Sequence, residues 1–254
     1  MTRFATSSDG ARIAHGCMGR GRAVLLVHGF SADRIRAWHE NGWAAALAEA
    51  GHEVIGFDVR GHGESDRPHH PAAYGTHLVE DMCAVLDAAG VSSAGVFGYS
   101  MGAHLAIAFA LEHPSRAERL VLGGVGEAYF ARDPVWFERI AAALEAEDGT
   151  EIRDLVARLH RKYGSENGND RLALAAFMRA PPPFHPASEM ARAALPVLVF
   201  CGERDGVSGR AEGLATAFPN GRALTIAGRD HHTAIADPAA MSAVLGFLGP
   251  ATRP

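Results

Sequence analysis

The stretch Gly98-Tyr99-Ser100-Met101-Gly102 decides the fold. It lies between two apolar runs, residues 94–97 with the length of a buried strand and residues 103–111 with the length of a helix. The pattern G-x-S-x-G at a strand-to-helix junction predicts a sharp turn that lifts the serine hydroxyl above the edge of a sheet. Because so tight a turn leaves little room for neighbouring side chains, it explains the two glycines. Since so short a pattern also recurs by chance, the rest of the chain has to support it.

Apolar runs on both sides of this junction predict further strands. They cover residues 23–27, 53–57, 120–123, 197–201 and 223–227. Stretches with helical patterns, such as 38–50 and 77–89, separate most of these runs. This alternation predicts an α/β fold with a doubly wound, mostly parallel sheet. Ligands of such sheets bind at the carboxyl ends of the strands, so we expect the functional residues there.

Motifs at the predicted strand ends follow one another along the chain. They are His28-Gly29-Phe30 and residues 58–65, 98–102, 202–205 and 228–231. With these motifs in this order, the chain resembles the α/β-hydrolase family over nearly its whole length. The resemblance implies the α/β-hydrolase fold and an esterase-like member with a nucleophilic serine.

Between the predicted strands ending at Gly123 and beginning near Pro196, the chain reads as helix rather than sheet. Helical spacing of apolar residues covers 135–146, 152–163 and 171–178, with glycines and prolines between them. The family resemblance implies that this insertion is a helical cap over the catalytic centre. We therefore expect a core of residues 1–126 and 188–254, and a cap of residues 127–187.

Composition excludes several classes of protein. The 254 residues suit one α/β domain with an insertion. A net charge of −5 with dispersed charges indicates no nucleic-acid or membrane partner. The first ten residues lack the apolar segment of a signal peptide, and no apolar run approaches the roughly 20 residues of a membrane helix. Cys17, Cys83 and Cys201 read as reduced, buried thiols, so we expect a cytoplasmic protein.

A nucleophilic serine needs a base, and the base needs a carboxylate that orients it. In this fold the chain order is serine, acid, histidine. Ser100 is the predicted nucleophile. Asp205 follows a buried strand and is the predicted acid, and His231 follows the last strand and is the predicted base.

Alternatives exist for both partners of the serine. His232 is adjacent to His231, but the distance to Pro238, which opens the last helix, favours His231. For the acid, Glu127 would serve if the carboxylate followed an earlier strand. Asp205 could instead cap the helix that follows Gly209.

The resemblance also assigns the groups around the reacting carbon. The backbone N–H groups of Phe30 and Met101 would form the oxyanion hole, with His28 holding the first of these loops. Residues 58–66 read as loop architecture rather than catalytic machinery. The fourteen histidines show no metal-binding spacing, so we expect neither a metal nor a cofactor.

A serine nucleophile predicts acyl transfer to water, whereas an aspartate at this position would indicate dehalogenation or epoxide opening. We expect a carboxylesterase-like enzyme that acts on a small-molecule ester or related acyl substrate. The apolar Phe30 and a short cap suit a modest apolar acyl group, and no exposed apolar lid helix stands out.

Two alternatives remain for the function. One is a carbon–carbon bond hydrolase or lyase acting on a ketoacid-like metabolite, which would need cations in the cap. The candidate cations are Arg132, Arg139, Arg158, Arg161, Lys162 and Arg179. The other is a non-catalytic ligand receptor of the same fold.

Overall fold

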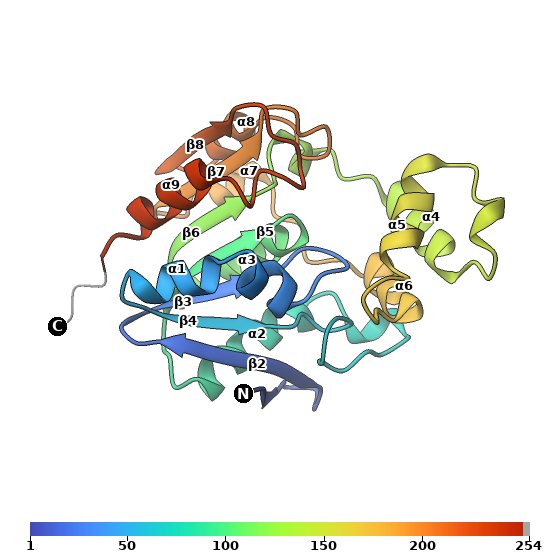
Figure 1. Ribbon diagram of the computed structural model, residues 1–254, viewed down its shortest axis with the longest axis horizontal. Coiled ribbons are helices and arrows are strands. Elements are labelled where there is room, and N and C mark those ends of the chain that lie inside the picture. Colours follow the sequence, from blue (N-terminus) through green and yellow to red (C-terminus); the bar gives the residue numbers. More distant parts are fainter. Residues whose placement is uncertain (251–254) are drawn as a thin grey trace.

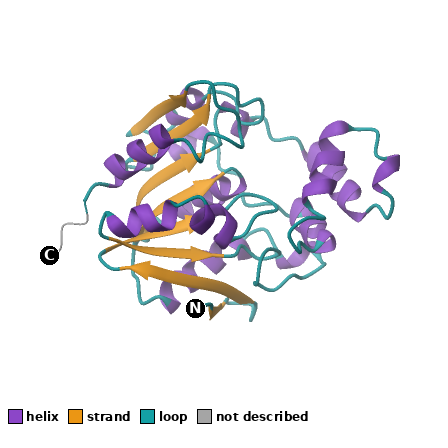
Figure 2. Ribbon diagram, in the orientation of Figure 1, coloured by secondary structure: helices purple, strands orange, loops and turns teal. Residues whose placement is uncertain are grey.

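A computed structural model describes residues 1–250 and contains one eight-stranded sheet (Figures 1 and 2). The strand order is β1-β2-β4-β3-β5-β6-β7-β8. Every pairing from β4 to β8 is parallel, while β1 pairs with β2 and β2 with β4 in antiparallel fashion. The strands are β1 (Arg3–Thr6), β2 (Arg12–Gly19), β3 (Arg22–Val27), β4 (His52–Phe57), β5 (Ala94–Tyr99), β6 (Ala117–Gly123), β7 (Val197–Gly202) and β8 (Gly221–Ile226). The predicted doubly wound, mostly parallel sheet is confirmed.

Helices cover both faces of the sheet, which is why the buried parts of its central strands are mostly apolar. Along β3, Leu25 and Val27 face the cluster that includes α2 (His77–Ala88) and α3 (Met101–Glu112). Val24 and Leu26 face the opposite cluster, with α1 (Trp43–Glu49) and α9 (Pro238–Leu248). A strand buried on both sides reads as a continuous apolar run, and this explains the pattern that predicted it.

Two predictions at the amino-terminal end are wrong. Residues 38–50 do not form one helix, because Gly42, with φ of 77°, separates the π-helical turn η1 (Ile35–Glu40) from α1. Cys17 is exposed on β2, a strand at the antiparallel side of the sheet that the sequence pattern did not indicate. Cys83 and Cys201 are buried, and all three thiols are free.

The segment between β6 and β7 is helical, as expected. Its elements are η3 (Glu127–Phe130), α4 (Pro134–Glu145), η4 (Gly149–Glu151), α5 (Leu155–Tyr163), α6 (Arg171–Arg179) and α7 (Ala187–Met190). Helices α4, α5 and α6 share an apolar cluster of their own and project away from the sheet in Figure 1. Helix α6 joins the two parts, because Leu174 and Met178 face that cluster whereas Phe177 packs into the main core.

The loop after β4 is built around buried ion pairs. Asp58 accepts hydrogen bonds from the backbone and guanidinium of Arg34, and Arg60 pairs with Asp81. These charged side chains are almost fully buried, and each finds a partner there, as buried charges must. Within residues 1–250, no helix combines the length and apolar character needed to cross a membrane.

Candidate active site

The predicted turn around Ser100 connects β5 directly to α3. Ser100 has φ of 54° and ψ of −116°, a backbone conformation that side chains disfavour and that recurs at functional sites. A Cβ atom at position 98 would lie 2.2 Å from the carbonyl oxygen of Gly102. One at position 102 would lie 2.0 Å from the carbonyl oxygen of Val27. The two glycines therefore permit the close approach that puts Ser100 at the end of the strand.

The structure brings Ser100, His231 and Asp205 into one hydrogen-bonded chain. His231 Nε2 lies 3.0 Å from Ser100 Oγ, and His231 Nδ1 lies 2.9 Å from Asp205 Oδ2. Because the carboxylate only accepts, Nδ1 carries the proton and Nε2 is free to accept the serine proton. This is the arrangement that a general base next to a nucleophile requires.

Asp205 is fixed by the loop that follows β7. Its Oδ1 accepts hydrogen bonds from the N–H groups of Val207 and Ser208, each at 2.9 Å. Burial, the largest effect, acts to raise the pKa of Asp205, but hydrogen bonds from His231 and Ser208 outweigh it and hold the pKa below its usual value. The carboxylate is therefore ionised at neutral pH. It does not cap α8 (Ala211–Ala215), whose N-cap residue is Arg210.

The alternatives for base and acid lie elsewhere. The ring of His232 is roughly perpendicular to that of His231, with centroids 5.5 Å apart, and His232 is exposed. Glu127 is also exposed, in η3, and packs beside Gly209 and Gly213. Asp205 is the carboxylate whose oxygen reaches His231.

The side chains of Ser208 and Tyr99 also contact His231, and neither was predicted from the sequence to do so. Ser208 Oγ lies 3.1 Å from Nδ1 on the side of Asp205. Tyr99 donates its hydroxyl to the carbonyl oxygen of His231 at 2.6 Å. Tyr99 directly precedes the predicted nucleophile, and this position could have drawn attention to it. Ser208 follows the predicted acid by three residues, a spacing at which both side chains can belong to the same turn.

The first predicted oxyanion loop is held by His28. Its Nδ1 donates to the carbonyl oxygen of Gly29 at 2.8 Å, and its Nε2 accepts from the N–H of Val59 at 2.9 Å. Burial lowers the pKa of His28, which keeps the ring neutral, and the two hydrogen bonds select this tautomer. The Gly29 carbonyl and the Phe30 N–H belong to one planar peptide unit and point in opposite directions. The hydrogen bond from His28 therefore contributes to the direction of the Phe30 N–H.

The second predicted donor is the N–H of Met101. Met101 is the first residue of α3, where backbone N–H groups have no partner inside the helix. The positive end of the helix dipole adds to the attraction for a developing negative charge.

We predict that Asp205→Asn lowers kcat by about 10⁴-fold. The amide can donate to His231 Nδ1, which favours the tautomer with the proton on Nε2 and removes the acceptor that Ser100 needs. Steady-state kinetics on a p-nitrophenyl ester measure the loss. Asp230→Asn is the control, since that exposed carboxylate caps its own loop through Thr233. Near-wild-type turnover in Asp205→Asn would remove Asp205 from the catalytic set.

Comparison with known proteins identifies the family of this chain. The family model for the alpha/beta hydrolase fold matches residues 22–169. The chain belongs to the alpha/beta hydrolase fold family. A hydrolase from Pseudomonas aeruginosa PA01 superimposes on this family member with a TM-score of 0.82 and 29% identity, covering 98% of each chain.

Curated relatives match a shorter part of the chain. Epoxide hydrolase 2 of Siraitia grosvenorii is 33% identical over 116 residues, 45% of this chain and 36% of that protein. The 2-hydroxy-6-oxononadienedioate/2-hydroxy-6-oxononatrienedioate hydrolase of Burkholderia vietnamiensis is 38% identical over 107 residues, 41% of this chain and 36% of that protein. The match thus spans about a third of the length of each.

Proposed function

We propose that this protein is a serine hydrolase that cleaves carboxylic esters through an acyl-enzyme. The observation that carries the proposal is the unbroken contact from Ser100 Oγ through His231 to Asp205. Ser100 attacks the ester carbonyl while His231 Nε2 takes its proton. Asp205 orients the imidazole and stabilises its cationic form.

The tetrahedral intermediate needs donors for its negative oxygen, and the proposal assigns this to the N–H groups of Phe30 and Met101. His231 then returns its proton to the leaving alcohol, which leaves the acyl group on Ser100. In the second half, water attacks the acyl-enzyme with His231 again as base. Residues 127–187 would cover this centre as a cap, with His160 of α5 packed against Phe30 at 6.0 Å between ring centroids.

The expectation that no apolar lid helix is exposed is wrong. Helix α5 exposes Leu155, Val156, Leu159 and Tyr163 to 59%, 44%, 39% and 38%. Tyr163 lies beside His232, so this apolar face begins next to the catalytic loop. It extends about 12 Å along the helix, given a rise of about 1.5 Å per residue. We therefore propose that the enzyme accepts longer apolar acyl groups than the sequence suggested.

We predict that Leu159→Asp lowers kcat/KM for p-nitrophenyl octanoate about tenfold but changes the acetate value less than twofold. Each methylene group that leaves water contributes about a fourfold preference, and a carboxylate on the apolar face removes that gain. Hydrolysis rates over a series of acyl lengths measure the effect. Leu172→Asp is the control, because it places the same charge on another exposed cap residue. Equal losses for all acyl lengths would contradict an acyl role for α5.

The chain matches part of a protein named epoxide hydrolase 2, but its nucleophile position does not suit epoxide opening. Epoxide opening through an alkyl ester calls for a carboxylate at the elbow, and this chain has Ser100 there. The proposal therefore favours acyl transfer over epoxide opening.

Carbon–carbon bond hydrolysis is the second candidate function. The half-buried cation of Arg132 in the cap favours it. Its guanidinium donates to the carbonyl oxygen of Pro182 and stacks over Phe137, while burial lowers its pKa. Burial lowers the pKa of His104, one helical turn from Ser100, to about 4, and the positive charge of Arg132 contributes to this shift. Arg139 and Arg179, in contrast, already pair with carboxylates. Faster turnover of a ketoacid than of simple esters would select this candidate.

A further inference from the structure

The oxyanion loop continues into a tight turn with an unusual residue at its centre. The N–H of Ala32 donates to the carbonyl oxygen of Gly29 at 3.3 Å, so Phe30 and Ser31 occupy the middle of the turn. Ser31 has φ of 61°, the left-handed region that residues with side chains disfavour. A turn in this conformation needs contacts that hold it in place.

His28 holds the turn from the side of the core, as described above. From the other side, Asn169 Nδ2 donates to the carbonyl oxygen of Ser31 at 3.0 Å. The same amide group donates to the carbonyl oxygen of Tyr163, the last residue of α5, at 3.2 Å. One side chain thus joins the end of a cap helix to the oxyanion turn.

We propose that Asn169 is a positioning residue that makes the Phe30 oxyanion donor dependent on the seating of the cap. This inference rests on the proposed function. With the bond in place, the Ser31 carbonyl is held in its strained turn and the Phe30 N–H is aimed at the site of reaction. When the cap lifts or the amide is lost, the turn can relax and the donor loses its direction.

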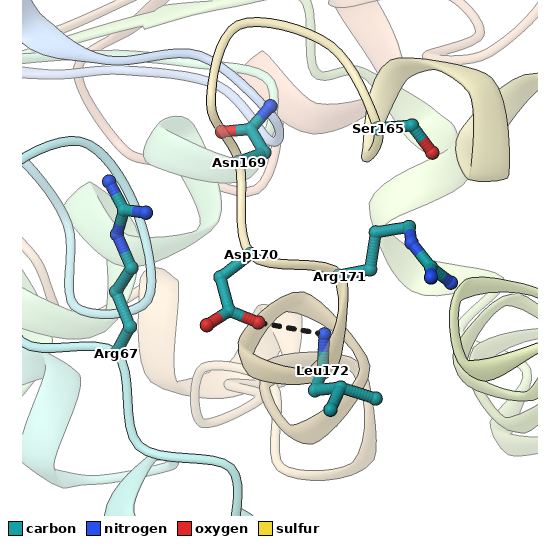
Figure 3. A pocket seen from close by; sticks show the side chains of 6 residues that line it. All are labelled: Arg67, Ser165, Asn169, Asp170, Arg171 and Leu172. Atoms are coloured by element: carbon teal, nitrogen blue, oxygen red, sulfur yellow. Dashed lines mark hydrogen bonds between the residues drawn. The ribbon is translucent and has the colours of Figure 1, made fainter.

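Neighbouring contacts at the same rim provide a matched control. Asn169 lies at the edge of a hollow of about 480 Å³, which Figure 3 shows with Arg67 on one side and Asp170 and Arg171 on the other. Between the loop after β4 and the cap, His69 Nε2 lies 2.8 Å from Asp170 Oδ2, and Arg67 donates to the carbonyl oxygen of Gly168 at 2.9 Å. These contacts also join cap to core, but they reach the loop after β4 and not the oxyanion turn.

The experiment compares Asn169→Ala and Asn169→Asp with His69→Ala in the full-length protein. We expect both Asn169 variants to lower kcat for a p-nitrophenyl ester about 10- to 100-fold with KM within twofold, since an oxyanion donor acts in the transition state. Affinity for a trifluoromethyl ketone, whose adduct carries the oxyanion, should fall in parallel. Asn169→Asp should be the more severe, because a carboxylate cannot donate to Ser31 and repels its carbonyl. His69→Ala should keep wild-type kcat.

Different results separate the two proposals. Equal kcat in Asn169→Ala and His69→Ala, or a change in KM alone, would overturn the role of Asn169 while leaving the esterase proposal intact. Wild-type protein that turns over no ester would overturn the proposed function itself. Thermal unfolding of each variant distinguishes a misdirected Phe30 N–H from an unfolded protein. We expect unfolding temperatures within a few degrees of wild type.

Discussion

Replacing Ser100 with alanine should lower kcat by about 10⁵- to 10⁶-fold, the size of the loss when a triad nucleophile is removed. The residual rate would come from the oxyanion donors and from substrate binding, which the substitution leaves in place. The fold should survive, because alanine keeps the Cβ atom that already occupies this strained position. Steady-state hydrolysis of a p-nitrophenyl ester gives the loss.

Ser93→Ala is the control for this variant. Ser93 lies in the loop before β5, and its hydroxyl donates a hydrogen bond to Glu118 of β6 at 2.8 Å. It should hydrolyse the ester at the wild-type rate. A Ser100→Ala protein that keeps even a tenth of wild-type kcat would mean that another group attacks the ester.

His231→Ala should lower kcat by about 10⁵- to 10⁶-fold, whereas His232→Ala should change it by less than threefold. The two histidines are neighbours in the chain, but only the His231 ring lies 3.0 Å from Ser100 Oγ through its Nε2 atom. His232 instead faces Tyr163 of α5. The pair of variants is its own matched control, since both remove an imidazole from the same loop. A large loss in His232→Ala, with His231→Ala active, would transfer the role of base to the second histidine.

The central sheet could be predicted because its strands are buried on both faces. Residues such as Leu25 and Leu26 meet different helical layers, so neither side of β3 tolerates polar residues. Strands β1 and β2 were not predicted because each has few buried residues and therefore no continuous apolar run. Their apolar residues Phe4 and Met18 are exposed. The helix break at Gly42 was missed for a different reason. The helical spacing of apolar residues continues across this glycine, whose left-handed backbone ends one helix before the next begins.

The residues of the site also include some that the sequence predicts and some that it does not. The prediction placed Ser100, Asp205 and His231 by motif order, and the structure brings these three side chains together. The contact of Asn169 with Ser31 could not have been predicted from the sequence. The two residues are 138 positions apart in the chain, and their contact depends on how the cap packs against the core. Periodicity identified α5 as a helix, but it cannot tell whether an apolar face is covered.

The most direct test of the acyl-enzyme proposal is the intact mass of the protein after treatment with a fluorophosphonate, followed by peptide mapping. We predict one adduct per chain, located on Ser100, with esterase activity lost in proportion to labelling. The Ser100→Ala variant should remain unlabelled. Labelling on another residue, or ester turnover that persists in fully labelled protein, would contradict Ser100 as the nucleophile.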